Sequence, residues 1–113
     1  MMEGTQMPNY LLAYHGGGMP ATEAERAHVM EAWGKWIGGL GAAMIDAGNP
    51  VGKTSMIAGN GAVSQGGGAN PVSGYSVIKA ENMDEAIRQA KGCPILSEGG
   101  GGSIEVCETF NAM

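Results

Sequence analysis

Basic side chains are scarce in this sequence. Lysine and arginine together number 6, against 11 acidic residues, and the formal net charge is −5. Nucleic-acid backbones and acidic membrane surfaces bind clusters of positive charge, whereas the cations here are scattered along the chain. We therefore expect neither a nucleic acid nor a membrane as a partner.

Long apolar segments are missing as well. No apolar run approaches the ~20 residues that a membrane-spanning helix needs. The first nine residues, MMEGTQMPN, contain neither a basic nor an apolar region, so we expect no secretion signal and a cytoplasmic protein. We expect residues 1–8 to form a flexible leader and residues 9–113 a single domain, because the length fits one domain.

Cysteine is limited to Cys93 and Cys107. The two form no C-x-x-C motif and no histidines cluster with them, which disfavours a structural zinc site. We expect no cofactor. A disulfide between the two cysteines is one alternative, but a chain without secretory features favours reduced, mostly buried thiols.

Charged residues of both signs make up only 15% of the chain, below the usual ~25%. Hydrophobic residues make up 43%. With so little charge to cover its surface, we expect the chain to bury part of its apolar surface against a second copy, in a homodimer.

Glycine is abundant, at 21 of 113 residues. The runs HGGGM, QGGGAN and EGGGGS are expected to be three separate loops. None of them fits the dinucleotide-binding pattern G-x-G-x-x-G between a strand and a helix.

Two helices are predicted. Thr22 and Glu25 form a capping box at the start of the first helix. An apolar stripe at three- and four-residue spacing continues this helix to about Leu40, where glycines end it. Asn82 caps the second helix, with Glu85 three residues later, and Gly92 follows its end.

Strands are predicted between and around these helices. The expected ranges are 9–15, 42–46, two short pieces around the GNG turn at 59–61, 72–80 and 103–110, with Ile104, Val106 and either Thr109 or Phe110 inward. The order is typical of a ferredoxin-like split βαβ fold of the α+β class, with two helices on one face of a mainly antiparallel sheet. The other face would be bare in a monomer, which again indicates a dimer.

The segment AGNPVGKT, residues 47–54, lies one residue from the phosphate-binding pattern G-x-x-x-x-G-K-[ST]. A phosphate loop must open directly into a helix whose amides bind the phosphates. Here the glycine-rich SMIAGNGAV follows, Ala47 replaces the leading glycine, and Pro50 removes an amide. We therefore interpret the segment as the turn after the second strand.

Histidine is the side chain best suited to proton transfer near neutral pH. His15 ends the first expected strand beside a glycine loop, and Asp46 ends the second, so the two are candidates for a shared proton-transfer pocket. The alternative is that both are ordinary loop and turn residues. His28 lies at the edge of the apolar stripe and is a catalytic candidate or a flanking polar residue. Tyr75 is a candidate polar group of a ligand pocket.

The segments GYSVIKAENMDEAIRQAKGCP and GGSIEVCETF resemble the carboxy-terminal half of the YCII-related (DGPF-type) domain family. WGKWIGGLGAAMIDAGNPVG also resembles the family's long first helix, following strand and turn. The resemblance covers residues 9–110 and implies a dimeric α+β barrel of ferredoxin-like subunits. The activity it implies is mostly undefined, since the relatives include proposed small-molecule enzymes and segments associated with sigma-factor genes.

Two positions depart from the family pattern. The DGPF motif is absent, since its place reads GGGANPVSG. Some members pair a histidine of the first helix with an aspartate before the proline that ends the second. His28 lies near the first position, but Cys93 occupies the second, so a His–Cys pair would replace it. Cys93 follows a helix C-terminus, which disfavours a reactive thiolate, and a buried helix-end thiol is the alternative.

Two functions remain open at this point. One is a small-molecule-binding protein or proton-transfer enzyme with a pocket between sheet and helices. The other is a structural or regulatory interaction module whose main function is assembly. The first predicts a concave pocket with converging polar groups and a shifted histidine pKa. The second predicts a filled interior with both histidines at the surface.

Overall fold

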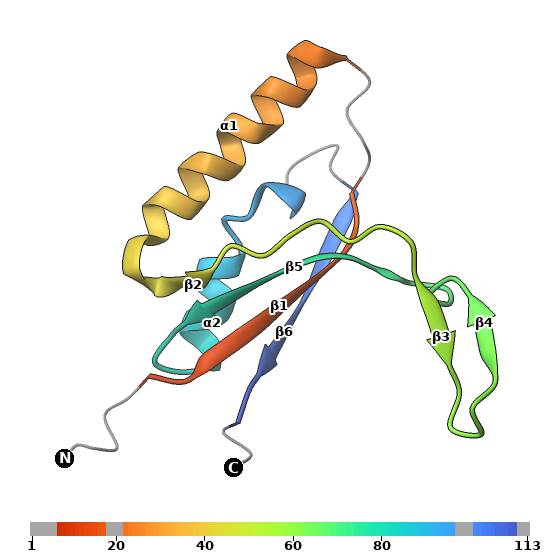
Figure 1. Ribbon diagram of the computed structural model, residues 1–113. Helices are drawn as coiled ribbons and strands as arrows, with labels where there is room; N and C mark the ends of the chain where they lie inside the picture. Colours follow the sequence, from red (N-terminus) through yellow and green to blue (C-terminus); the bar gives the residue numbers. More distant parts are fainter. Residues whose placement is uncertain (1–6, 18–21, 97–100, 111–113) are drawn as a thin grey trace.

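The computed structural model describes residues 7–17, 22–96 and 101–110. Most of the expected leader lies outside these residues. The chain is α+β, with two helices and a mainly antiparallel sheet (Figure 1). The Cα atoms extend over 49 × 44 × 18 Å, so the molecule is thin in one direction.

Four strands form the main sheet in the order β2-β5-β1-β6. They are β1 (Asn9–Gly16), β2 (Met44–Asp46), β5 (Val72–Lys79) and β6 (Gly102–Glu108). Each neighbouring pair is antiparallel. This order is compatible with the expected ferredoxin-like fold, because β1 and β5 are the central strands and each helix connects one of them to an edge strand.

Alternation along the strands divides the sheet into two unlike faces. Tyr10, Leu12 and Tyr14 of β1 and Ile78 of β5 point to the helices and are buried. Ile104 of β6 packs against this core, as does Val106, both as expected. We call the opposite side of the sheet the open face, and the pairing register places these residues on it: Leu11, Ala13 and His15 of β1, Tyr75, Val77 and Lys79 of β5, and Ser103, Glu105 and Cys107 of β6.

The first helix, α1 (Glu23–Leu40), begins with the predicted capping box. The Thr22 side chain accepts from the backbone N–H of Glu25, whose carboxylate accepts from the backbone N–H of Thr22. The helix ends before Gly41, which has a φ of 54°. No residue of α1 is fully buried, and Met30 is 66% exposed. The expected apolar stripe is covered only in its second half, because the first half of α1 extends past the strands (Figure 1).

The second helix, α2 (Met83–Ala90), is also capped as predicted, with the Asn82 side chain accepting from the backbone N–H of Glu85. Ala86 and Ala90 of α2 are buried in the same core that contacts Trp33 and Trp36 of α1. Both helices therefore contribute side chains to the core on this face of the sheet. Short 3-10 turns follow each helix, η1 (Gly41–Ala43) and η2 (Pro94–Leu96), so the second strand begins at Met44 rather than at the expected Ala42.

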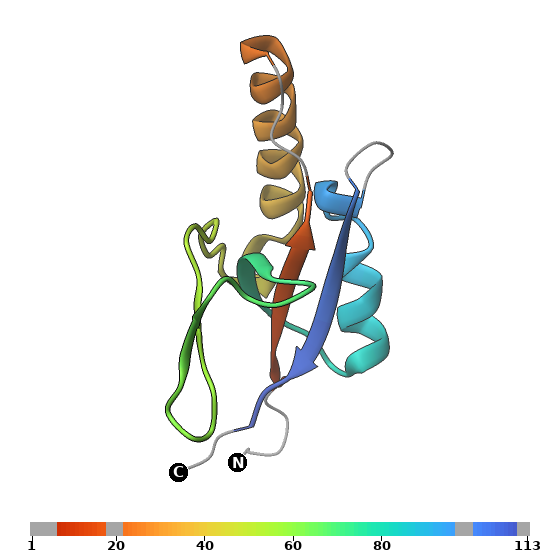
Figure 2. The ribbon, with the colours of Figure 1, turned by 90° about the vertical axis from the view of Figure 1, so that its right-hand side faces the viewer.

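Strands β3 (Ser55–Ile57) and β4 (Val63–Gln65) form the expected hairpin around the GNG turn. We call residues 55–65 the arm. It projects from the body on the side of the sheet opposite α2 (Figure 2). Thr54 is followed directly by β3 and not by a helix, so residues 47–54 are not a phosphate loop, as predicted. After a local turn at Asp46–Gly48 the segment is extended, and Pro50 bridges to Gly74 of β5. Gly48 in this turn has a φ of 74°, and a Cβ there would lie 1.7 Å from the Tyr75 carbonyl oxygen.

A chain of hydrogen bonds crosses the core beneath α1. The Tyr14 hydroxyl donates to Ser76 Oγ at 2.7 Å, and Ser76 Oγ donates to the Ala47 carbonyl oxygen at 2.7 Å. The Tyr14 ring also meets Trp33 edge-on at a centroid distance of 5.4 Å. Because Ser76 is fully buried, these bonds satisfy polar groups that water cannot reach.

One expectation at the end of the last strand is wrong. Phe110, one of the two residues expected inward after Val106, is 80% exposed, and Thr109 is exposed as well. The strand ends at Glu108, and the Thr109 side chain instead donates to the Asn9 carbonyl oxygen at 2.8 Å.

Replacing Tyr14 by phenylalanine removes the donor to Ser76 while keeping the ring. We expect the Tyr14→Phe variant to lose about 1–2 kcal/mol of unfolding free energy, because the buried Ser76 hydroxyl loses a partner. Urea unfolding followed by circular dichroism measures this. Tyr75→Phe is the matched control. Among the described residues, its hydroxyl accepts from the exposed Asn49 amide and from no other group, so we expect a change within about 0.5 kcal/mol. Equal losses in the two variants would contradict this account of the core.

Candidate functional site

The most strongly connected titratable group in the described residues is His15. Its side chain is 5% exposed, although it lies on the open face. Nε2 lies 2.6 Å from Glu105 Oε1 on β6. Nδ1 lies 3.0 Å from the carbonyl oxygen of Asn70 and 3.1 Å from that of Pro71, in the segment between β4 and β5.

These partners define the protonation state that fits the site. Carbonyl and carboxylate oxygens only accept hydrogen bonds, so both ring nitrogens of His15 must donate for all the contacts to form. The Glu105 carboxylate raises the pKa of His15 above its ordinary value of 6.5. Burial opposes this pKa shift, and the carbonyl oxygens of Pro71 and Asn70 add to it. The geometry is therefore that of an imidazolium held by three acceptors.

The other open-face candidates lie apart from His15. Asp46 on β2 aligns with Val77 on β5, and Val77 pairs with Leu11 on β1. Leu11 is four residues from His15, so Asp46 and His15 are separated both along the strands and by the intervening strand β5. The Asp46 carboxylate accepts from the backbone N–H of Gly48 at 2.9 Å, which is the turn role left open by the sequence. The structure does not bring His15 and Asp46 together.

Tyr75 also lies on the open face, and its hydroxyl accepts from the Asn49 side-chain amide at 3.2 Å. This places Tyr75 beside the segment after β2. Its register partner Ala13 is two residues from His15 on β1, but within the described residues no hydrogen bond joins the two side chains. Within the described residues, no hydrogen bond joins any two of the four polar candidates His15, His28, Asp46 and Tyr75.

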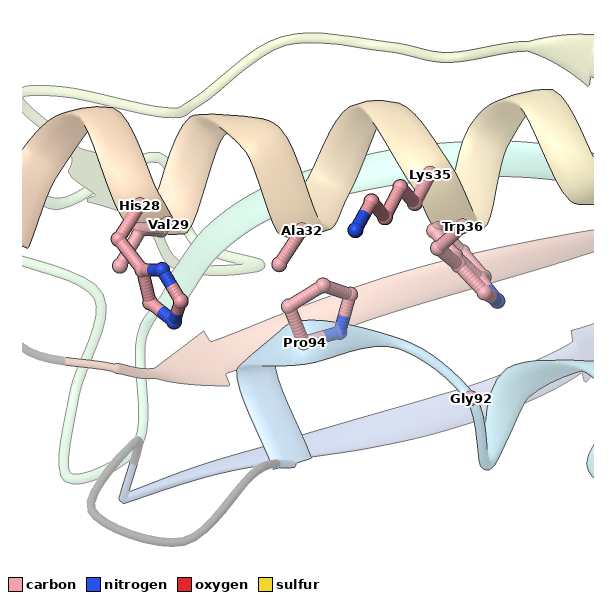
Figure 3. Close-up of a pocket in the computed structure, with 7 residues that line it drawn as sticks. All are labelled: His28, Val29, Ala32, Lys35, Trp36, Gly92 and Pro94. Carbon is pink, nitrogen blue, oxygen red and sulfur yellow. The ribbon is translucent and has the colours of Figure 1, made fainter.

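His28 lines a groove between α1 and the segment after α2. The hollow has a volume of about 530 Å³ and is lined by His28, Val29, Ala32, Lys35, Trp36, Gly92 and Pro94. Figure 3 shows the His28 imidazole and the Lys35 amine on the side of α1 that faces Pro94. At one end the Trp36 indole N–H donates to the Gln89 carbonyl oxygen at 3.0 Å, which fixes the indole against α2.

Cys93 points away from this groove into the core. It is 2% exposed and is a free thiol, as is Cys107. Burial raises the pKa of the Cys93 thiol to about 11, against the smaller opposing effects of the Ile95 backbone and the Tyr14 hydroxyl. The thiol is therefore protonated at neutral pH, and the structure does not bring it together with His28.

Glu105 is the site residue that the sequence reasoning missed. Its position between Ile104 and Val106 puts it on the opposite face from these two inward residues. The same alternation puts His15 opposite Tyr14. The sequence signal was therefore available. If the first and last strands are assumed to pair antiparallel, the alternation in each strand places His15 and Glu105 on the same face of the sheet.

Metal and membrane features are absent from the part of the chain that the structure describes. No group of three or more histidine, cysteine, aspartate or glutamate side chains there is arranged to hold a metal ion. Of the helices in that part, none has the length and apolar character to cross a membrane.

Comparison with known proteins gives no assignment. The chain matches no protein-family model, and no curated protein is significantly similar to it. Function must therefore be argued from the geometry alone, and the resemblance to YCII-related domains stays a prediction.

The raised pKa of Cys93 predicts slow alkylation. At pH 8 the thiolate fraction of a thiol with a pKa of about 11 is roughly 100-fold below that of one with the ordinary value of 9.0. We expect iodoacetamide to label Cys93 at least that much more slowly in the folded chain than in urea, as measured by peptide mass spectrometry. Rapid labelling of the folded chain at Cys93 would contradict its placement in the core and reopen a nucleophilic role.

Proposed function

We propose that this chain is an interaction module that acts as a homodimer, with the open face of one copy covered by the open face of the other. The observation that carries the proposal is the open face itself. The central residues Leu11, Ala13 and Val77 are apolar, and the chain's own helices both lie on the other side of the sheet. Sheets with one face on a core leave mainly polar residues on a solvated face.

The arm supports the same proposal. None of its strand residues is buried, and Met56, Ile57 and Val63 are 44%, 71% and 64% exposed. An isolated two-stranded hairpin is at best marginally stable in water. Because the arm projects on the side of the open face (Figure 2), an object seated on that face can cover its apolar side chains as well.

A second copy is the occupant that these features fit. A two-fold interface uses the same patch on both subunits and must therefore be self-complementary. The open face offers an apolar centre, a cation at Lys79 on β5 and an anion at Glu105 on β6. Two such faces can pair their apolar centres and place opposite charges together, and each arm can reach the neighbouring subunit.

The assembly proposed here agrees with the dimeric α+β barrel that the resemblance to YCII-related domains implies. The resemblance also leaves the activity undefined, and the DGPF motif is missing, so we assign no reaction to the chain. The cytoplasmic setting is proposed on the sequence features alone.

Light scattering coupled to chromatography tests the assembly. We expect a mass of twice 11.5 kDa at micromolar concentration. Val77→Lys places a charge at the centre of the open face, and Ile57→Lys places one on the arm, where the residue is 71% exposed and its loss cannot unfold the monomer. Both variants are expected to run as monomers, because burying an unpaired charge is costly.

Ile87→Lys is the matched control, since Ile87 is 37% exposed on α2, on the other side of the sheet. It should stay dimeric, and circular dichroism should show that all three variants are folded. A wild-type monomer would refute the proposal. A dimer that survives Val77→Lys and Ile57→Lys but is lost in Ile87→Lys would place the interface on the helices instead.

We propose as a second candidate that the groove of α1 binds a small organic anion. The observation in its favour is the combination of Lys35 and His28 with the apolar Val29, Ala32 and Trp36 around one hollow. A carboxylate or phosphate can pair with the Lys35 ammonium and accept from an N–H of the His28 ring, while an apolar body lies along the indole.

A thermal-shift screen of small carboxylates and phosphates tests this candidate. We expect a stabilising ligand whose addition shifts the Trp36 indole resonance, and at least a five-fold weaker affinity in Lys35→Gln. Lys53→Gln removes the same charge outside the groove and should bind like the wild type. A ligand that binds Lys35→Gln as well as the wild type would exclude the groove as its site.

A further inference from the structure

The arm is attached to the sheet by two segments that differ in kind. The first segment leads from β2 to the arm and follows β5 through backbone hydrogen bonds, from Val51 N–H to the Ser73 carbonyl at 2.9 Å and from Tyr75 N–H to the Asn49 carbonyl at 3.3 Å. These bonds do not depend on any ionisable group. The segment therefore holds one side of the arm in the same way at every moderate pH.

The second segment, residues 66–71, leads from the arm back to β5 and is held differently. It begins with three glycines, of which Gly66 and Gly68 have φ values of 85° and 86°. Glycine provides little conformational restriction of its own. The two carbonyl oxygens near the end of the segment, those of Asn70 and Pro71, both contact His15 Nδ1. The sequence GGGANP contains no charged side chain.

His15 therefore joins two parts of the molecule that are distant in the chain. Its Nε2 side is bound to Glu105 on the edge strand β6, and its Nδ1 side is bound to the segment that leads to the arm. Residues 66–71 are also bound to the segment that leads from β2 to the arm, because Gly66 N–H donates to the Thr54 carbonyl oxygen at 2.8 Å. His15 thus holds the end of this segment that lies next to β5, and the Gly66–Thr54 bond holds the end next to the arm.

Loss of one proton breaks this arrangement on one side. A neutral imidazole carries a single N–H, so one of its nitrogens then presents a lone pair to an oxygen. Either the carboxylate of Glu105 or the pair of carbonyl oxygens loses its donor. Within the described residues Glu105 is the charged side chain in contact with His15, and the facing positions Val72 of β5 and Ser103 of β6 are uncharged.

We propose that His15 is a protonation-controlled latch that fixes the base of the arm to the sheet as an imidazolium and releases it as a neutral ring. The folded chain raises the pKa of His15 above 6.5, so the stabilising contacts are complete below the ordinary pKa and are lost as pH rises through the raised one. The arm is accordingly ordered below pH 6.5 and loosened as the pH rises through the raised pKa of His15. If the chain forms the dimer proposed above, in which the arm contacts the partner subunit, loosening of the arm also weakens the dimer. This consequence rests on the proposed function.

Nuclear magnetic resonance of the full chain between pH 6 and 9 tests the latch. The His15 ring signals, distinguished from those of His28 with a His28→Asn variant, should titrate with a midpoint above 6.5. The {¹H}-¹⁵N NOE values of the arm amides should fall with the same midpoint. A His15 midpoint at or below 6.5, or an arm whose NOE values do not follow that midpoint, would overturn the proposal.

Two variants and a control sharpen the test. In Glu105→Gln the side chain has no charge to hold the imidazolium, so the His15 midpoint and the loosening of the arm should both move to lower pH. His15→Gln has no group that titrates, so the order of the arm should become independent of pH. Glu108→Gln makes the same charge change on β6 at an exposed residue that is not a partner of His15, and should behave like the wild type.

Light scattering at the same pH values separates the latch from the dimer. A chain that is monomeric at every pH and still couples the arm to His15 keeps the latch and refutes the dimer. If the chain is a stable dimer but the NOE values of the arm do not change as His15 titrates, the dimer proposal stands and the latch proposal is refuted.

Discussion

The packing of both helices against a single face of the four-stranded sheet is the constraint from which the other features follow. Tyr10, Leu12, Tyr14 and Ile78 are buried on that face. Within the described residues, the apolar side chains at the centre of the opposite face, Leu11, Ala13 and Val77, are only partly buried. Sheets and helices must bury their apolar faces to be stable, which makes assembly the simplest account of this surface.

Among the described residues, the open face also contains a buried titratable side chain, that of His15. His15 is almost inaccessible, yet it keeps a carboxylate partner that is 68% exposed. A buried charge is tolerated only when it is paired and hydrogen-bonded, and the three acceptors around the ring meet that requirement. The same contacts connect Glu105 on the edge strand to residues 70–71, which lead to the arm. The protonation of His15 and the position of this segment are therefore linked in the proposal above.

Local signals in the sequence predicted most of the fold. Thr22, Glu25 and Asn82 specify helix starts through contacts a few residues away, and the GNG turn specifies the hairpin. The site was harder, because His15 and Glu105 are separated by 90 positions and meet only through strand register. The exposure of Met30 and Phe110 could not be predicted from the sequence either, because it depends on how far α1 and the end of β6 extend past the rest of the sheet.

The most direct measurement is an isotope-filtered NOE experiment on a mixture of ¹³C-labelled and unlabelled chains. The account predicts intermolecular NOEs from the methyl groups of Leu11 and Val77, at the centre of the open face, and from Ile57 on the arm. Intermolecular NOEs confined to residues of α1 and α2, or none at a concentration where the labelled chain is dimeric, would contradict the claim that this face is where two copies meet.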